Sequence, residues 1–202
     1  MAEQRANPAP LGLAGFGLTT TVLTLHVAGI LPAEGESVVF ALAFAFGGAA
    51  QLIAGVLEYV NGNTFGTTAF TSYGAFWWWV ALNTWTAGAG WITAPAASGA
   101  AVTLLFWGVF TFYLWIATWT HPRAVWLLFL LLWVVFLLLA LGDFGLSFLT
   151  PIGGWVGVVL GLLALYISAA LVINDSFKRD VLPLGAPLAK PATPSEAPAP
   201  AS

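Results

Sequence analysis

The chain has 202 residues, of which 60% are hydrophobic and only 6% are charged, with a net charge of −3. A water-soluble domain of this size needs far more charged surface, so the composition predicts a membrane protein with several spans. With no cysteine, two histidines and five basic residues, the chain excludes disulfides, thiolate or multi-histidine metal sites and a nucleic-acid interface, and we expect no metal, no cofactor and no nucleic-acid partner.

Apolar segments of about 20 residues are long enough to cross a lipid bilayer as helices. The segments of this length are separated by short links rich in Pro, Gly, Asn and Asp, which leave no room for a soluble domain. The sequence therefore predicts an all-α, polytopic membrane protein, folded as a compact bundle of six transmembrane helices. The expected spans are 12–31, 37–60, 69–91, 99–120, 124–142 and 152–173.

The basic residues all fall on one side of these six spans. Arg5 precedes the first span, Arg123 lies in the fourth link, and the other three follow the sixth span. The first, third and fifth links hold only acidic charges, Glu34, Glu36 and Asp143. The positive-inside rule then places both termini in the cytoplasm and the protein in the cell membrane as a multi-pass protein.

This orientation divides the chain into three expected parts. They are a cytoplasmic N-terminal segment at 1–11, a six-helix membrane domain at 12–173, and a cytoplasmic C-terminal segment at 174–202 that ends in a disordered Pro- and Ala-rich tail.

Two helix starts on the cytoplasmic side combine backbone breakers with polar groups. The first is Asn7–Leu13, with two prolines and with glycines following, and the second is Asn61–Gly74, with Asn, Gly and hydroxyl residues. Irregular backbone at membrane depth is tolerated only where protein buries it or where it lines a cavity. The two starts are therefore either ordinary turns with small-residue packing, or they converge on one path and present their helix N-termini to a solute.

The same stretches resemble the acetate uptake transporter family, whose bacterial members are called succinate–acetate permeases. The likeness rests on NPAPLGL at 7–13 and GNTFGTTAFTSYG at 62–74. It continues through 15–17, 19–20, 47–48, Gln51, 58–59, 107–111 and 181–185. The resemblance implies a homohexamer with one path per subunit and transport of acetate and related small carboxylates, with succinate as a further candidate.

Members of that family have an aromatic–aliphatic constriction on the path. The resemblance carries two of its positions onto Phe16 and Tyr73. The third position is a leucine of the fifth span, which falls at Leu132 in the run Leu130–Leu132. The resemblance thus implies a gate formed by Phe16, Tyr73 and Leu132.

Polar residues inside apolar spans are costly and so mark functional candidates. No Lys or Arg lies inside a span, so an anion would depend on hydroxyls, amides and helix N-termini. An apolar gate also favours a solute with a small methyl body, passing either protonated or briefly stripped of water. The candidates for solute binding are Asn7, Thr20, Gln51, Thr67, Thr71 and Ser72.

Two titratable residues, Glu58 and His26, are candidates for a link between transport and protons. Glu58, near the cytoplasmic end of the second span, either couples transport to protons or orients the second helix start, or it is a carboxylate that caps backbone amides of the following turn. His26, in the outer half of the first span, is either a pH sensor or a neutral histidine hydrogen-bonded to a neighbouring helix. His121, beside Pro122, is expected on the cytoplasmic surface.

Other functions compete with acetate transport. A six-helix hexameric channel for urea, amides or another small neutral solute would use a similar aromatic constriction. An intramembrane enzyme would need a paired acid–base set or a metal cluster, and the chain has no HExxH motif, no close Ser–His–Asp order and no paired aspartates in one span, so no enzyme is expected. A purely structural protein would leave the polar helix starts unexplained. The sequence does not decide between a passive channel and proton-coupled transport.

Overall fold

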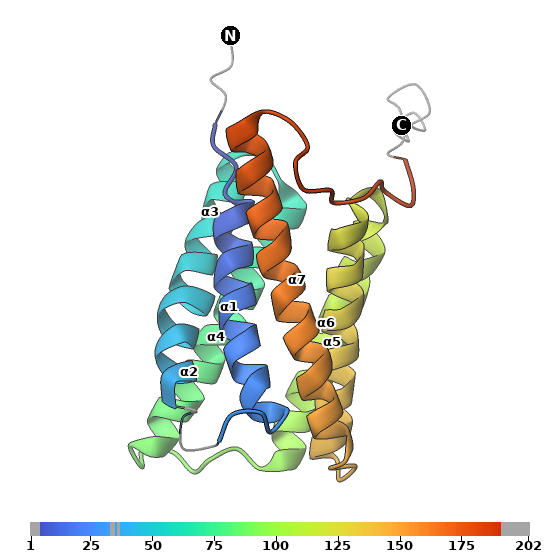
Figure 1. The fold of residues 1–202 in the computed structure, drawn as a ribbon. Coiled ribbons are helices and arrows are strands. Elements are labelled where there is room, and N and C mark those ends of the chain that lie inside the picture. Colours follow the sequence, from blue (N-terminus) through green and yellow to red (C-terminus); the bar gives the residue numbers. More distant parts are fainter. Residues whose placement is uncertain (1–4, 33–34, 36, 191–202) are drawn as a thin grey trace, which may run out of the picture.

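The computed structural model describes residues 5–32, 35 and 37–190, so Glu34, Glu36 and the Pro- and Ala-rich tail after Lys190 lie outside the described residues. Within the described part every regular element is a helix, and Figure 1 shows the long helices running side by side in one bundle. The elements are α1 (Ala9–Val27), α2 (Ser37–Leu42), the π-helix η2 (Ala43–Ala50), α3 (Gln51–Val60), α4 (Thr64–Gly88), α5 (Ala97–Ala117), the short 3₁₀ helix η3 (Thr118–Thr120), α6 (Arg123–Asp143) and α7 (Leu149–Phe177).

The predicted all-α bundle of six long helices is confirmed, because α2, η2 and α3 form one continuous rod over Ser37–Val60. Five of the six rods are long and apolar enough to cross a membrane. The sixth, α4, carries many hydroxyl groups and tryptophans, which lower its mean hydropathy. Its 25 residues nevertheless span about 37 Å, more than the roughly 30 Å of a bilayer core.

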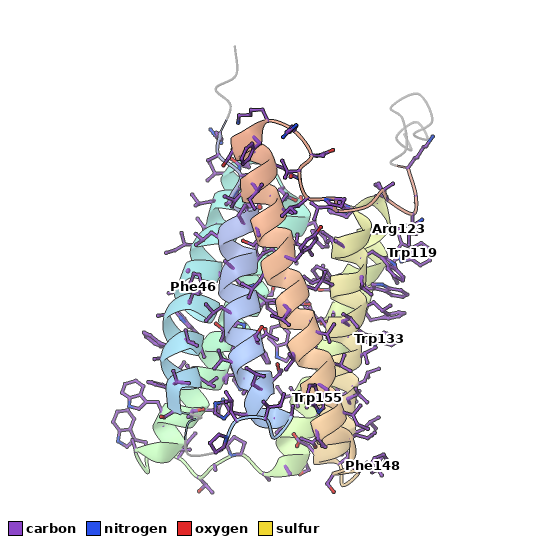
Figure 2. All side chains as sticks on the ribbon, in the orientation of Figure 1. Phe46, Trp119, Arg123, Trp133, Phe148 and Trp155 are labelled. Atoms are coloured by element: carbon purple, nitrogen blue, oxygen red, sulfur yellow. The ribbon has the colours of Figure 1, made fainter. Side chains whose placement is uncertain are left out.

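The outside of the bundle is apolar, as lipid contact requires. Phe148 and Trp155 are more than half exposed, and Figure 2 shows their side chains at the surface of the bundle. Helix α1 begins and α7 ends at the same end of the bundle (Figure 1). The basic residue Arg123 also lies at this end (Figure 2). The observed arrangement therefore agrees with the cytoplasmic side assigned from the basic residues.

The start of α1 is a regular helix, not a broken one. The Asn7 Oδ1 atom accepts a hydrogen bond from the Ala9 amide at 3.0 Å, which closes a turn before the helix. Pro10 lies in the first helical turn, where a missing amide donor costs nothing. Helix α1 begins at Ala9, ahead of the expected residue 12, so the two prolines initiate the helix.

The start of α4 is likewise a capped helix. The Asn63 Oδ1 atom accepts a hydrogen bond from the Gly66 amide at 3.0 Å, as an N-cap residue does. The two helix starts are also tied together, because the Arg5 guanidinium donates to the Val60 carbonyl and the Asn61 Nδ2 donates to the Ala6 carbonyl at 3.1 Å. The two cytoplasmic starts therefore lie side by side.

Gly15 and Gly17, which follow the start of α1, allow this helix to pack closely against its neighbours. A Cβ atom at Gly15 would lie 2.5 Å from the Phe46 carbonyl oxygen of η2, and one at Gly17 would lie 2.8 Å from the Gly161 carbonyl oxygen of α7. Neither backbone oxygen can move aside without disturbing its helix. These glycines therefore hold α1 between η2 and α7, as small residues do at membrane helix contacts.

The second rod contains a π-helix, which the sequence did not predict. In η2 the helix is widened over Ala43–Ala50, and the Trp78 indole Nε1 donates to the Phe44 carbonyl at 3.0 Å. A π segment leaves backbone carbonyls without their usual helical partner, so a donor from another helix can stabilise it. The contact joins η2 to α4 on the outer side of the bundle.

The chain after α7 folds back over the cytoplasmic end. Helix α7 continues past residue 173, the end of the expected sixth span, to Phe177. Residues 181–189 then cross from α7 to the ends of α5 and α6 (Figure 1), so the disorder that we expected of the Pro- and Ala-rich stretch is wrong for residues 183–189. We call residues 181–189 the C-terminal strap. Its Leu184 carbonyl accepts a hydrogen bond from the Ala124 amide at 2.9 Å, and its Ala189 amide donates to the Trp119 carbonyl at 2.9 Å.

The contact of α1 with α7 predicts which glycine tolerates a methyl group. A Cβ atom at Gly161 would lie 2.2 Å from the Thr21 Oγ1 and 2.8 Å from the Thr21 amide nitrogen, whereas one at Gly99 would meet nothing within 4 Å. Gly161→Ala should therefore lower the free energy of unfolding by about 1–3 kcal/mol through overpacking. Tryptophan fluorescence during thermal unfolding in detergent measures this, with Gly99→Ala as the matched control. Equal stability of both variants would contradict the close contact.

Candidate functional site

A cavity of about 230 Å³ lies between the two helix starts at the cytoplasmic end. Both starts contribute to its wall, together with α3, α6, α7, the link before α6 and the C-terminal strap. The lining residues are Asn7, Ala9, Leu13, Phe16, Gln51, Glu58, Asn63, Phe65, Gly66, Ala69, Phe70, Tyr73, His121, Pro122, Val125, Leu128, Phe129, Leu132, Ile167, Leu171 and Leu184. The convergence that the sequence raised as one of two alternatives is therefore present in the fold.

The cavity ends near the middle of the bundle. Phe16, Tyr73 and Leu132 lie seven to nine residues into α1, α4 and α6, which at 1.5 Å per residue is about 10–14 Å from the cytoplasmic helix ends. All three are buried and line the cavity. We call these three residues the cavity floor. A bilayer core is about 30 Å thick, so the floor lies near its middle.

Tyr73 is fixed in place by its contacts. Its hydroxyl oxygen lies 2.9 Å from the Thr111 Oγ1, which itself donates to the Trp107 carbonyl at 2.7 Å. A threonine hydroxyl has one proton, so Tyr73 is the donor in the first bond. The Tyr73 ring also contacts Phe16, Trp107 and Phe110, with centroid distances of 6.1, 5.9 and 5.5 Å. The segment 107–111 therefore serves to position Tyr73.

The structure also distinguishes among the consecutive leucines of α6. Leu132 is buried and lines the cavity, whereas Leu130 and Leu131 are only partly buried and do not line it. A helix turns by 100° per residue, so consecutive residues cannot share one face. Leu132 is the member of the run that meets Phe16 and Tyr73 at the cavity.

The polar groups of the cavity lining are amide, carboxyl and imidazole side chains and the Tyr73 hydroxyl. Gln51 and Glu58 are 1% and 3% exposed and lie two turns apart on one face of α3. Their Oε1 atoms are buried and have no hydrogen-bond partner among the described residues. No Lys or Arg is among the cavity-lining residues that the structure describes. An anion in the cavity would therefore depend on amide and imidazole groups and not on a lysine or arginine.

Glu58 is bound to the cap of α4. The Asn63 Nδ2 donates to the Glu58 Oε2 at 2.8 Å, while the Asn63 Oδ1 caps the helix. The partner of Glu58 is thus the side-chain amide of the N-cap residue and not the backbone amides of the turn, which agrees with a role in orienting the second helix start. Gly66 has to be glycine at this contact, because a Cβ there would lie 2.7 Å from the Glu58 carboxyl carbon.

Neither histidine has the surroundings that the sequence predicted for it. His121, which we expected on the cytoplasmic surface, is partly buried, lines the cavity and packs on Phe65 with ring centroids 4.5 Å apart. His26 lies away from the cavity, and its Nδ1 is 3.0 Å from the Pro32 carbonyl of its own loop, not bonded to a neighbouring helix. The cavity-lining Phe129, also missed, contacts the Phe65 ring in a tilted arrangement with ring centroids 5.2 Å apart.

Several expected solute-binding residues do not line the cavity. Gly66, Ala69, Phe70 and Tyr73 follow helical spacing along its wall, so Thr67, Thr71 and Ser72 lie on other faces of α4. The Thr67 hydroxyl donates to the Asn63 carbonyl, the Thr71 hydroxyl packs where a Cβ of Gly55 would be, and Ser72 borders an open groove between α4 and α5. Thr20 is buried one turn beyond Phe16, past the cavity floor. Of the six, Asn7 and Gln51 line the cavity.

The described residues contain no group of three or more His, Asp or Glu side chains that could hold a metal ion. The cavity is instead an apolar chamber with a few acceptor groups. Such a chamber suits a small, largely apolar solute with one polar end.

Comparison with known proteins bears on what this chamber is. The model of the GPR1/FUN34/yaaH family matches residues 1–184. The chain belongs to this family. The family membership confirms the resemblance that the two helix starts indicated.

Individual members are similar over most of the chain. The succinate-acetate/proton symporter SatP of Escherichia coli is 43% identical over 181 residues, covering 89% of this chain and 95% of the symporter. Acetate permease A of Emericella nidulans is 36% identical over 199 residues, covering 91% of this chain and 67% of the permease. The solved structure of the bacterial acetate channel SatP matches with a TM-score of 0.87 and 42% identity, covering 90% of this chain and 100% of that chain.

These matches agree with the six-helix fold and place the chain in a family of transporters and channels, not of enzymes. Together with the apolar helices, they show that the protein is a multi-pass protein of the cell membrane.

The Asn63–Glu58 bond gives a prediction that depends on pH. Asn63→Ala removes both the cap and the bond, and should lower the free energy of unfolding by about 1–2 kcal/mol at any pH. Asn63→Asp keeps a capping oxygen but places a second carboxyl group against Glu58. The decrease in the free energy of unfolding should therefore be largest at neutral pH and smaller in acid, where the two carboxyl groups share a proton. Thermal unfolding in detergent at several pH values measures both. A pH-independent loss in Asn63→Asp would contradict this contact.

Proposed function

We propose that this protein transports acetate and related small carboxylates, with succinate as a further candidate, through the cavity of each subunit. The observation that carries the proposal is the cavity: it lies at the cytoplasmic end, is mostly apolar, and ends at Phe16, Tyr73 and Leu132. Similarity to relatives named for acetate and succinate supports this solute class.

The size of the cavity suits a solute of a few heavy atoms. About 30 Å³ is the share of one water molecule in the liquid, so 230 Å³ holds on the order of seven waters. Acetate with a partial hydration shell fits into this space. A drug-sized ligand needs roughly 300–1,000 Å³.

The charges around the cavity favour the undissociated acid as the species that crosses the floor. An ionised carboxylate loses its hydration in an apolar chamber, and no lysine or arginine of the described lining replaces that hydration. In this proposal the carboxyl O–H of the neutral acid donates to Gln51 or Glu58 after a side-chain rotation, because the Oε1 atoms of both are buried and lack a partner among the described residues. The proton then travels with the solute, and Glu58 and His121 are the carboxyl and imidazole groups of the described lining that can exchange it.

The cavity floor acts as the gate in this proposal. Phe16, Tyr73 and Leu132 come from three helices at similar depth, and the Phe16 and Tyr73 rings lie 6.1 Å apart. Passage requires these side chains to separate by rotamer changes or small helix shifts. Their apolar surfaces then admit the methyl end of the acid and exclude ions with their water.

We further propose that six copies assemble, each with its own path. The cavity supports a path within one subunit, because helices of a single chain enclose it. Native mass spectrometry of the detergent-solubilised protein should give a hexamer, and a stable monomer would contradict this assembly.

Reconstituted vesicles test the transport function against the urea-channel alternative. Labelled acetate should enter vesicles that contain the protein faster than protein-free vesicles, with internal acidification that follows the acetate taken up. Labelled urea should enter both kinds of vesicle at the same rate. The protein-free control is essential because acetic acid also crosses lipid unaided. Protein-dependent urea entry without acetate entry would replace this proposal by its alternative.

Substitutions at the cavity floor test the gate in the same vesicles. Phe16→Ala and Tyr73→Ala should each raise the entry of butyrate relative to acetate by about tenfold. This is the lower end of the discrimination that a closely fitting hydrophobic pocket achieves for one methylene group. Phe148→Ala, at an exposed position on the opposite end of the bundle, should match the wild type. Unchanged rate and selectivity in both floor variants would remove the gate from the mechanism.

A further inference from the structure

The C-terminal strap has no role in the mechanism above, although its sequence, Val181–Gly185, was among the stretches that resemble the family. A segment rich in proline and without helix or strand commonly stays loose. This one is held at several points by polar atoms of the helices, so its position at the cytoplasmic end is well defined.

The first anchor of the strap is Asn174 of α7. Its Oδ1 accepts hydrogen bonds from the Val181 and Leu182 amides at 2.8 and 2.9 Å, and its Nδ2 donates to the Leu182 carbonyl at 2.9 Å. One side chain thus satisfies three backbone groups. The Tyr166 hydroxyl adds a bond to the Pro183 carbonyl at 2.7 Å.

The second anchor is the N-terminus of α6. The first amides of a helix have no partner within the helix. Here the Arg123 amide donates to the Gly185 carbonyl at 3.3 Å and the Ala124 amide donates to the Leu184 carbonyl at 2.9 Å. Gly185 has φ +77°, which strongly favours glycine, and a Cβ there would lie 3.0 Å from the Arg123 Cβ.

These anchors place the Leu184 side chain at the cavity. Leu184 is the residue of the strap that lines it, and it packs against the apolar core while Leu188, four residues later, is about half exposed. The other lining residues beside the start of α6 are His121, Pro122 and Val125, which mark the cytoplasmic mouth. The mouth therefore has an aliphatic side chain supplied by a segment outside the membrane helices.

We propose that Leu184 is a specificity-determining residue, which limits the length of the carboxylic acid that can enter the cavity from the cytoplasmic side. The inference rests on the proposed transport function. The gate at the floor and Leu184 at the mouth then bound the chamber from two ends, so an acid has to fit between them. In this proposal a longer alkyl chain contacts Leu184 when its carboxyl group lies near Gln51 or Glu58, which line the same cavity.

The experiment compares uptake of labelled acetate and butyrate in vesicles for the wild type, Leu184→Ala and Leu188→Ala. Leu184→Ala should raise the butyrate-to-acetate ratio by about fivefold, somewhat less than a methylene in a fully enclosed pocket, because the mouth is partly open. Leu184→Val, which keeps more of the packing, should shift the ratio less and in the same direction. Leu188→Ala is matched in residue type and segment and should keep the wild-type ratio.

The outcomes separate the two proposals. If the wild type takes up acetate and Leu184→Ala and Leu184→Val both keep its ratio, Leu184 does not set specificity and the transport function stands. If both variants lower acetate uptake without changing the ratio, the strap only supports α6 and the inference is overturned. If the wild type takes up no acetate beyond protein-free vesicles, the transport function itself is wrong.

Discussion

The position of Phe16 depends on the two glycines that flank it. Gly15 lets α1 touch the Phe46 carbonyl of η2, and Gly17 lets it touch the Gly161 carbonyl of α7. With α1 held on both sides, the ring between these glycines reaches Tyr73, whose own hydroxyl is bound to Thr111 on α5. Close backbone contact of α1 with its neighbours, together with the buried Tyr73–Thr111 hydrogen bond, therefore fixes the geometry of the cavity floor.

The cavity lining is polar in some places and apolar in others. The buried face of α3 carries Gln51 and Glu58, whereas α6 contributes the apolar residues Val125, Leu128, Phe129 and Leu132. A solute with a carboxyl group and a methyl group can turn each end to a matching wall. The relatives are named a symporter, a permease and a channel, and a neutral acid that carries its own proton is compatible with each of these descriptions.

Much of the fold followed from the sequence because its signals are local. The length of the apolar segments predicted six membrane helices, and the positions of the basic residues predicted how these helices are oriented in the membrane. The π-helix η2 was not predictable, because it depends on the Trp78 side chain of α4. The order of the C-terminal strap was missed for a similar reason, since its partners at Arg123 and Ala124 are far away in the chain.

The candidate site was predictable in part. Phe16, Tyr73 and Leu132 came from the family resemblance and all line the cavity, although their role as a gate stays a prediction. Helical spacing from Tyr73 alone excludes Thr67 and Thr71 from the wall, so these two positions could have been rejected from the sequence. His121 could not be placed from its neighbours, because its contact with Phe65 joins two separate helix starts.

Thiol labelling tests most directly whether the cavity is the transport path, because the natural chain has no cysteine. Val125→Cys places a thiol in the cavity wall, and Ser176→Cys places one at the exposed cytoplasmic end of α7. In inside-out membrane vesicles, a membrane-impermeant thiol reagent should stop acetate transport by Val125→Cys, acetate should slow that labelling, and labelled Ser176→Cys should transport normally. Complete labelling of Val125→Cys with undiminished acetate transport would contradict the account.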